Sequence, residues 1–593
     1  MSTGNTVEKQ IAGTRIIIIG GVAAGTSAAA RARRMSEDAE IVVYEKYKYI
    51  SFSTCGMPYY VSGKISDIGD LVINDAAQFE KRFNLSVKTQ HEVKSIDAGA
   101  KRVEIIDLST GRVFTDSYDK LIITTGSDPV IYTNGIEGAP NVFMLKTIDD
   151  AAKLKDHIDF LYDSNAATEG PNNIESGDRK AGPGTDGAAK DRVNAVILGG
   201  GYVGLEVLEA FLLKGFHVTV IEKTSQVLPM FDHEIIEYME NYLAEKGVEL
   251  IKNEEVKDIV KNADGQITSI FTAAGRQLPV DLVFIGTGTK PQVNLAKNCG
   301  LDIGQSGAIS VNELMQTSEP DIYAAGDCCE CIDFLTGKKQ AYNLAFIANM
   351  QGRCAGSNAV GGQEKFGESI PTSIIKILDV SIAKTGLGFL QAKKLQIDAA
   401  KIELHYLNHA GYYPGASMIH MLAVYEKTAG TIIGFEAIGR ESVDKKLDTM
   451  AVAIRSRMKI WELANLNLGY HPVYGSAKDS LNIIGMIGEN LKNGLHDTID
   501  VEELKGRISG GNAPVILDVR TRREFAMGHI EGAINMPVDE LRSNIGKLDR
   551  DSEIVVHCRT SYRSYLAYRI LKNNGFNNVK NLNGSYLSWM RRL

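Results

Sequence analysis

The sequence predicts an α/β protein of several domains, and three observations predict it. A chain of 593 residues with 44% hydrophobic content is long enough for several cores, at about 100–200 residues per domain. An apolar run, a glycine-rich turn, a helix and a second apolar run follow one another twice, from residues 15 and 195. The final stretch, residues 497–593, again alternates strand-like and helix-like segments and is long enough to fold alone.

The first repeat is a βαβ unit. Residues 15–19 form a strand-like run, an alanine-rich helix is expected from about Gly25 to Met35, and residues 40–44 form a second strand that ends at Glu45. Its turn keeps the first and third glycines of a dinucleotide fingerprint, Gly20 and Gly25, but has Val22 where the middle glycine is usual. We expect these glycines and Glu45 to bind a dinucleotide at the helix N-terminus.

The second repeat carries a complete G-x-G-x-x-G fingerprint after a strand expected over 195–198, with glycines at Gly199, Gly201 and Gly204. These glycines let the backbone approach a pyrophosphate at the helix N-terminus. Glu222 ends the next strand, at the spacing expected of an acid that binds a ribose 2′-hydroxyl. Because a carboxylate there repels a 2′-phosphate, NADH is the favoured cofactor and NADPH is the alternative.

Two further segments, 121–129 and 317–327, each end a β-like run on glycine and an acid. The second segment places Asp327 where it can accept hydrogen bonds from a polyol such as the ribityl chain of a flavin.

Taken in order, these motifs make residues 14–480 resemble the flavoprotein pyridine nucleotide-disulfide reductases. The resemblance implies two Rossmann-like domains, with FAD in the first and NAD(P)H in the second, and an α+β dimerisation domain that makes a homodimer. It also implies four further cofactor-binding residues: Lys46, Thr125, Gly126 and Gly288. The expected boundaries are 14–162 and 292–365 for the FAD domain, 163–192 for a flexible insertion, 193–291 for the NAD domain, 366–480 for dimerisation, 481–496 for a connector and 497–593 for the final domain.

One cysteine stands out in the first domain. The run from Ser51 to Tyr59 contains Cys55 and no second cysteine five residues on, so no local Cys-x4-Cys disulfide can form. Cys55 must therefore exchange sulfur with an external partner. This run resembles the single-cysteine branch of the family, the coenzyme A-disulfide reductases and NADH-dependent persulfide reductases, which place the cysteine beside the flavin. Thr54 stands where that branch usually has asparagine.

A binding site for coenzyme A is expected near this cysteine. On the first helix, three side chains share one face at i, i+4 and i+7, namely Ser27, Arg31 and Arg34. The resemblance adds Ser51, Thr54 and, from the partner subunit, Lys478. The alternative is that the arginines complement the helix dipole and stay solvated.

Two tyrosines near prolines, Tyr413 and Tyr474, match positions at which related enzymes bring phenols to the sulfur site across the dimer interface. A phenol can protonate a departing thiolate, although tyrosines beside prolines can also simply cover a core. A zinc site is one hypothesis for the cluster of Cys328, Cys329 and Cys331, but no Cys-x-x-Cys pair or nearby histidine supports it. We therefore expect small core residues there and predict no metal site.

The C-terminal part carries four motifs, at residues 516–520, 524–537, 557–558 and 581–584, and Trp589 follows them. Together these motifs resemble a rhodanese domain over nearly the whole of residues 497–593. Cys558 lies between a strand expected over 554–556 and a helix expected over 564–572, where backbone N–H groups stabilise a thiolate or persulfide. Arg559 and Arg563 should lower the pKa of this thiol. Two serines depart from the family pattern, Ser561 and Ser585, at positions where glycine is usual. The alternatives are a phosphatase relative and an inactive scaffold.

Composition excludes several classes of partner. A net charge of −8 without a long basic tract disfavours nucleic acid. The N-terminus lacks signal-peptide features, and no run of about 18 apolar residues predicts a membrane span. Seven scattered cysteines, an odd number, favour a reducing compartment. We expect a cytoplasmic homodimer that acts on a small thiol, disulfide or persulfide.

The sequence thus predicts an FAD-dependent NAD(P)H:coenzyme A-disulfide or persulfide reductase, with Cys55 as its redox residue and coenzyme A as substrate or ligand, fused to a rhodanese that carries sulfane sulfur on Cys558. One alternative is an NADH oxidase or peroxidase in which Cys55 cycles through sulfenic acid. Another is a sulfur-carrier module whose flavoprotein part only senses NADH.

Overall fold

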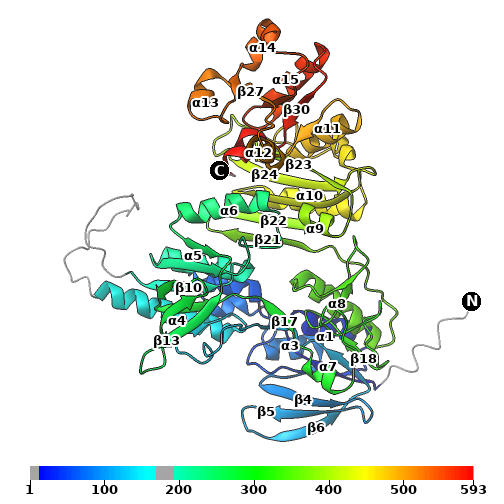
Figure 1. Cartoon of the computed structure of the whole chain (residues 1–593). Helices are drawn as coiled ribbons and strands as arrows, with labels where there is room; N and C mark the ends of the chain where they lie inside the picture. Colours follow the sequence, from blue (N-terminus) through cyan, green and yellow to red (C-terminus); the bar gives the residue numbers. More distant parts are fainter. Residues whose placement is uncertain (1–12, 168–191, 592–593) are drawn as a thin grey trace, which may run out of the picture. The chain divides into compact units, whose positions relative to one another are not determined.

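The computed structural model describes residues 13–167 and 192–591. The chain separates into two compact units (Figure 1). The first unit contains Met1–Val227 and Lys246–Pro371, and the second contains Leu228–Glu245 and Thr372–Leu593. Most of the expected insertion, residues 168–191, lies outside the described residues, and its first residues, 163–167, belong to helix α4 (Ile148–Ala167). No helix of the described ranges is long and apolar enough to cross a membrane.

The first unit begins with a five-stranded parallel sheet in the order β18-β7-β1-β2-β3. Its strands are β1 (Arg15–Ile19), β2 (Glu40–Tyr44), β3 (Ser86–Lys88), β7 (Lys120–Ile123) and β18 (Ile322–Ala324). Helices α1 (Ala23–Met35) and α8 (Ala345–Ala359) pack closely. Gly352 permits this approach, because a Cβ at that position would lie 2.2 Å from the carbonyl oxygen of Ala24. The sheet thus joins segments on both sides of the second repeat, as the predicted two-part domain requires.

The second repeat forms a matching parallel sheet in the order β12-β11-β10-β16-β9. Its strands are β9 (Val142–Phe143), β10 (Asn194–Leu198), β11 (His217–Glu222), β12 (Glu249–Lys252) and β16 (Leu282–Ile285), and α5 (Tyr202–Leu213) follows β10. The predicted βαβ units are therefore both present. The first unit also holds two antiparallel three-stranded sheets, β4 (His91–Asp97), β5 (Arg102–Asp107) and β6 (Val113–Ser117), and β13 (Val256–Lys261), β14 (Ile267–Thr272) and β15 (Gln277–Pro279).

Shorter elements complete the first unit. They are α2 (Met57–Val61), α3 (Ala76–Phe83), α7 (Asn294–Asn298), the antiparallel pair β8 (Ser127–Pro129) and β17 (Thr289–Pro291), and the pair β19 (Cys331–Ile332) and β20 (Lys339–Gln340).

The second unit begins with a five-stranded antiparallel sheet in the order β21-β22-β25-β24-β23. Its strands are β21 (Thr372–Ile377), β22 (Val380–Gly386), β23 (Ala399–Leu407), β24 (Met418–Glu426) and β25 (Ile432–Gly439). Helices α6 (His233–Glu245) and α10 (Val443–Arg455) pack on this sheet, and α9 (Phe389–Lys394) lies against β23. Helix α6, which the sequence assigns to the NAD domain, therefore packs on the expected dimerisation domain.

Residues 481–496, expected as a connector, hold an ordered helix, α11 (Ser480–Lys492). Asp479 caps its N-terminus by accepting a hydrogen bond from the backbone N–H of Leu481. The helix packs on the 3₁₀ segment Ile460–Asn465, and a Cβ on Gly485 would lie 2.0 Å from the backbone nitrogen of Ala464. This segment is therefore part of the packed α+β domain.

The C-terminal residues form a parallel sheet in the order β26-β30-β29-β27-β28, coloured orange to red in Figure 1. Its strands are β26 (Thr498–Ile499), β27 (Val515–Asp518), β28 (Ile534–Asn535), β29 (Ile554–His557) and β30 (Val579–Leu582), and its helices are α12 (Val501–Ser509), α13 (Arg522–Ala526), α14 (Val538–Asn544), α15 (Tyr562–Asn573) and α16 (Ser585–Arg591). Leu517, Val556 and Tyr568 lie in its buried core. The expected α/β architecture of this domain is confirmed.

Candidate functional site

The first glycine turn needs glycine at both predicted positions. Gly20 has a positive φ of 103°, and a Cβ there would lie 2.4 Å from the carbonyl oxygen of Thr124. A Cβ on Gly25 would lie 1.8 Å from the carbonyl oxygen of Gly20. The turn therefore packs tightly against the end of β7 and leads into the N-terminus of the 13-residue helix α1, where a phosphate can bind.

The two repeats hold an acid in the same way. The Glu45 carboxylate accepts hydrogen bonds from the backbone N–H of Gly21 at 2.6 Å and of Tyr47 at 2.9 Å, and burial raises its pKa. The Glu222 carboxylate accepts a hydrogen bond from Gly200 at 2.8 Å. Each carboxylate thus faces the glycine turn of its own repeat, where a ribose hydroxyl of a bound dinucleotide would lie.

The second turn leaves space for a ligand. A Cβ on Gly201 would have the carbonyl oxygen of Gly286, at 3.6 Å, as its nearest neighbour. Gly288 has a φ of 94° and a Cβ there would meet nothing within 4 Å. These residues and the donor sets around both glutamates fit the two dinucleotides expected from the sequence.

Asp327 lies at the carboxyl end of β18, next to the end of β7. Its carboxylate accepts a hydrogen bond of 3.1 Å from the Ser127 hydroxyl, and burial raises its pKa. Thr125 donates its hydroxyl to the carbonyl oxygen of Gln292 at 2.7 Å, and Gly126 has a φ of 69°. The predicted polyol-binding acid and the 125–126 segment therefore meet at one sheet edge.

Lys146 lies at the same edge, and the sequence motifs do not identify it. Its ammonium donates to the carbonyl oxygen of Ser127 and lies 3.8 Å from an Asp128 carboxylate oxygen. It also acts electrostatically on both Glu45 and Asp327, lowering the pKa of each against the effect of burial. By contrast, the predicted Lys46 pairs with Glu92 at 3.1 Å and is half exposed.

Cys55 lies in a 3₁₀ turn, Thr54–Gly56, that leads into α2. The Ser53 hydroxyl caps this turn by accepting a hydrogen bond from the backbone N–H of Gly56 at 3.1 Å. The thiol is free and exposed, and all seven cysteines of the chain are free. Partial desolvation by the surrounding protein raises the pKa of Cys55, while a hydrogen bond from Thr54 lowers it. Thr54 thus polarises the thiol at the position where the related branch has asparagine.

Glu206 on α5 lies close to Cys55 and was not predicted. Desolvation, followed by the nearby charge of Glu209, raises the pKa of Glu206 to about 7. Its charge in turn raises the pKa values of Cys55 and Tyr59. The only sequence signal is its position two residues after the last fingerprint glycine, Gly204, which puts it in the second turn of the helix.

We expect the change Glu206→Gln to lower the pKa of Cys55. Below pH 7 the Glu206 carboxyl is neutral and wild type and variant should agree; above pH 7 the wild-type charge opposes the Cys55 thiolate. Because folding raises the pKa of Glu206, its contribution to stability is lost as the pH rises from about 4.5 through about 7. At pH 8 the variant should therefore also gain unfolding free energy, by up to about 3 kcal/mol.

The measurement is the rate of Cys55 alkylation against pH, with chemical unfolding at pH 5 and pH 8. The exposed Glu137 offers the matched control Glu137→Gln, which should change neither quantity. Identical alkylation profiles for wild type and Glu206→Gln would contradict the expected coupling.

The predicted coenzyme A residues lie on two elements of the first unit. Along α1, the Ser27 hydroxyl donates to Asn349 at 2.6 Å, Arg31 pairs with Glu364 at 3.1 Å, and Arg34 is exposed. Ser51 has a positive φ of 48° and its hydroxyl accepts a hydrogen bond from Asn74 at 3.2 Å. Arg34 is therefore the member of the helical face whose charge meets solvent directly, and the role of the set stays a prediction.

The second unit contains the two predicted catalytic tyrosines and the predicted substrate-binding Lys478. Tyr413 and Tyr474 are exposed, by 41% and 67%, and Lys478 is also exposed. The tyrosines therefore do not cover a core of the described chain, and their role at a dimer interface stays a prediction. Cys328, Cys329 and Cys331 are buried at 0–5% exposure, which confirms the expectation that they are core residues.

Cys558 follows β29 and precedes α15, and it is buried. Its backbone N–H donates to the Ser585 hydroxyl at 2.9 Å, and the Ser564 hydroxyl lies 3.6 Å from its Sγ. Ser561 and Ser585 both have positive φ, of 85° and 61°, which explains why the family has glycine at these positions. The serines keep the glycine conformation, at a cost of about 1–2 kcal/mol each, and Ser585 adds a hydroxyl beside the sulfur.

Arg563 places a positive charge beside the Cys558 thiol. Its guanidinium binds both carboxylate oxygens of Glu524 at 2.7 Å and also interacts with the Cys558 thiol. The ion pair lowers the pKa of Glu524 to about 2. Arg559 is exposed. Arg563 is thus held in place beside the sulfur, whereas Arg559 faces solvent.

Three family descriptions match the chain. Pyridine nucleotide-disulphide oxidoreductase matches residues 14–352, the dimerisation domain of the same family matches 372–480, and the rhodanese-like domain matches 500–592. An NADH oxidase of Methanocaldococcus jannaschii is 31% identical, over 79% of this chain and 97% of its own. An NAD(P)H coenzyme A polysulfide/persulfide reductase of Pyrococcus horikoshii is 30% identical, over 80% and 98%.

Two solved structures resemble the chain over almost its whole length, including the C-terminal domain. The reduced CoADR-RHD of Bacillus anthracis is 33% identical, covers 98% of each chain and has a TM-score of 0.89. An NAD-dependent persulfide reductase from A. fulgidus is 36% identical, covers 97% of this chain and 100% of its own, and has a TM-score of 0.85. The two relatives above cover about four fifths of the chain, as a protein without the C-terminal domain would.

Proposed function

Because the chain belongs to the pyridine nucleotide-disulphide oxidoreductase family, we propose that it reduces coenzyme A persulfide or coenzyme A disulfide with electrons from NADH. The observation that carries this proposal is Cys55, a free and exposed thiol with a hydrogen-bonding neighbour in Thr54. Enzymes of the family use FAD and NAD(P)H. When bound, these cofactors supply a hydride and relay its two electrons.

The chain's own residues define the sulfur step. The Cys55 thiolate attacks the coenzyme A sulfur of a persulfide, the S–S bond of the persulfide breaks, and HS⁻ leaves. Cys55 and coenzyme A are then joined in a mixed disulfide, which two electrons and a proton return to a Cys55 thiolate and free coenzyme A. Overall, coenzyme A persulfide, NADH and H⁺ give coenzyme A, H₂S and NAD⁺.

The nucleotide-binding residues have positioning roles. Gly20, Gly25 and Glu45 would hold FAD, with Asp327 on its ribityl chain, and the second fingerprint with Glu222 would hold NADH. The dimerisation domain and the exposed Tyr413, Tyr474 and Lys478 support a homodimer in which the partner completes the sulfur site.

The substrate test compares three oxidants. Anaerobic NADH oxidation by the purified yellow protein is measured with coenzyme A persulfide and with coenzyme A disulfide, and a third sample receives air alone. We expect either sulfur substrate to be turned over at least about tenfold faster than oxygen. Fast turnover with air alone would support the second candidate, an NADH oxidase, which the 31% identical relative of that name favours.

The exposed Arg34 should contact a phosphate of coenzyme A. The change Arg34→Glu is then expected to raise KM for coenzyme A persulfide by about tenfold, because it replaces attraction with repulsion at one partly solvated contact. KM for a small persulfide such as cysteine persulfide should stay within about twofold. Steady-state kinetics with both substrates decide the point, with Arg112→Glu, an exposed arginine away from α1, as the control. Equal changes for both substrates would refute a phosphate contact.

A further inference from the structure

A buried polar cluster that includes neither Cys55 nor Cys558 lies on the antiparallel sheet of the second unit. Glu403 and His405 are two residues apart on β23, so their side chains leave the same face of the strand. His420 on β24 is the direct cross-strand partner of His405. The three side chains are 2%, 1% and 1% exposed.

The cluster brings three potential ligand atoms together. His420 Nε2 lies 2.8 Å from Glu403 Oε1, and the two imidazole rings stack with centroids 4.1 Å apart and planes inclined by 22°. One nitrogen from each histidine and one carboxylate oxygen all lie within 4.8 Å of one another. No other group of three such side chains with this spacing occurs in the described parts of the chain.

A fourth polar atom closes the cluster from the rhodanese domain. The Ser588 hydroxyl on α16 lies 2.5 Å from Glu403 Oε1 and 2.8 Å from His405 Nε2. Ser588 is itself 1% exposed. Three short contacts therefore link four polar atoms from three elements, β23, β24 and α16.

We propose that Glu403, His405 and His420 bind a divalent cation of the zinc class. Imidazole nitrogens and a carboxylate are ligands that zinc prefers, and three protein ligands with a hydroxyl or water oxygen in the fourth position give its usual four-coordination. A tetrahedral ion with bonds of about 2.0–2.1 Å holds its ligands about 3.3 Å apart. Neighbouring atoms of the cluster, now 2.5–2.8 Å apart, need to separate by about 0.5–0.8 Å to reach this spacing.

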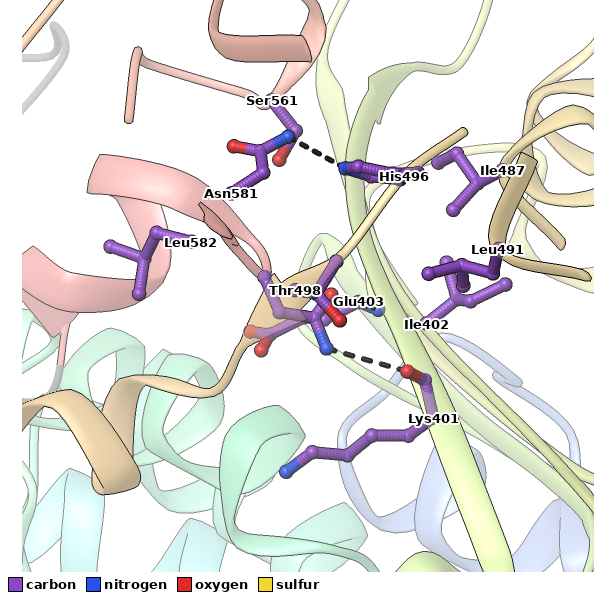
Figure 2. Close-up of a pocket in the computed structure, with 11 residues that line it drawn as sticks. Lys401, Ile402, Glu403, Ile487, Leu491, His496, Thr498, Ser561, Asn581 and Leu582 are labelled. Atoms are coloured by element: carbon purple, nitrogen blue, oxygen red, sulfur yellow. Dashed lines mark hydrogen bonds between the residues drawn. The ribbon is translucent and has the colours of Figure 1, made fainter. Parts of the chain in front are cut away.

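The location indicates a structural ion at the interface between the dimerisation sheet and the rhodanese domain. Asn583 accepts a hydrogen bond from the backbone N–H of Glu403 at 3.0 Å and donates one to Asp500 at 2.9 Å. A Cβ on Gly584 would lie 2.7 Å from Cδ of Glu403, so the two domains are in direct contact there. Glu403 and its strand neighbours line a cavity of about 10 Å³ together with Thr498, Asn581 and Leu582. Figure 2 shows the side chains that line this cavity. An ion held here would fasten α16 to β23 and β24 and be shielded from solvent.

The test uses the full-length protein with Zn²⁺ as the probe. The protein is treated with a chelator, incubated with a slight excess of Zn²⁺, passed through a desalting column and analysed for metal by mass spectrometry. We expect about one zinc per chain in wild type and less than about a tenth in His420→Ala and Glu403→Gln. The control His409→Gln changes another buried histidine of the same domain and should keep the zinc.

A second measurement decides the question even if a variant fails to fold. Wild-type protein loaded with Co²⁺ should show the intense visible absorption of four-coordinate cobalt without a thiolate charge-transfer band, because the site contains no cysteine. Wild type that retains no zinc, a thiolate band, or a weak six-coordinate spectrum would each overturn the proposal. Any of these outcomes would show that the cluster is a hydrogen-bonded domain interface without a metal ion.

Discussion

Replacing Cys55 with serine is expected to lower persulfide-dependent NADH oxidation by about a thousandfold or more. A serine hydroxyl is not ionised near neutral pH and cannot form the S–S bond on which the proposed cycle depends. The variant should still bind flavin and should still be reduced by NADH in one rapid turnover, because the glycine turns and both glutamates are unchanged. Stopped-flow bleaching of the flavin and steady-state NADH oxidation separate these two steps.

The half-buried Cys299 gives the matched control, because it is also a free thiol of the first unit. Cys299→Ser should retain full turnover with coenzyme A persulfide. If Cys55→Ser kept more than about a tenth of wild-type turnover, the sulfur substrate would have to receive electrons without a bond to Cys55, and the proposed cycle would be wrong. If its oxygen-dependent turnover rose while the sulfur reaction vanished, access of oxygen to the reduced flavin would be the cause.

The glycine turns could be predicted because their constraint is local. Gly20 and Gly25 have no room for a Cβ, so glycine is required at both positions and can be recognised in the sequence. The same holds for Glu45 and Glu222, which follow a strand and return to the turn preceding it. The domain assignments drew on motifs of this kind, and the family matches at 14–352, 372–480 and 500–592 agree with the predicted family and fold class.

What escaped prediction depends on contacts between distant segments. Glu206 has its raised pKa because the packed first unit desolvates it, and Lys146 reaches Ser127 and Asp327 only after β7 and β18 are paired. Likewise, Glu403, His405 and His420 carry no motif spacing, since the register of two strands brings them together. The helix over residues 480–492 resembled a linker because its packing partner, the 460–465 segment, could not be recognised from local pattern.

The two serines of the rhodanese loop illustrate a departure that packing explains. Ser561 and Ser585 replace glycines yet keep positive φ, so the loop geometry survives the change of residue. Ser585 adds a hydrogen bond to the backbone of Cys558, which offsets part of the backbone strain. The departures therefore do not argue for an inactive scaffold.

We expect Cys558→Ser to lower sulfur transfer from thiosulfate to a thiol by about a thousandfold or more, because the loop loses the sulfur that would carry the persulfide. The serine should fit, since hydroxyls of Ser564 and Ser585 already surround this side chain. Reduction of free coenzyme A persulfide by NADH should stay within about twofold of wild type. Cyanide-trapped thiocyanate and NADH oxidation measure the two activities on the same preparation.

Sulfur transfer and NADH oxidation, measured together, distinguish the alternative functions. A sulfur-carrier that only senses NADH requires that neither wild type nor Cys558→Ser turn over NADH with persulfide, whereas two independent centres leave the wild-type turnover intact in the variant. If NADH oxidation with free persulfide fell together with sulfur transfer, Cys558 would be an obligatory entry point for sulfur, and the supply to Cys55 would have to pass through the rhodanese loop. The change Cys328→Ser is the control, because Cys328 is a buried core thiol that neither proposed activity uses. Loss of both activities in Cys558→Ser with both retained in Cys328→Ser would therefore show that sulfur passes from the rhodanese domain to the reductase, which independent sites would not allow.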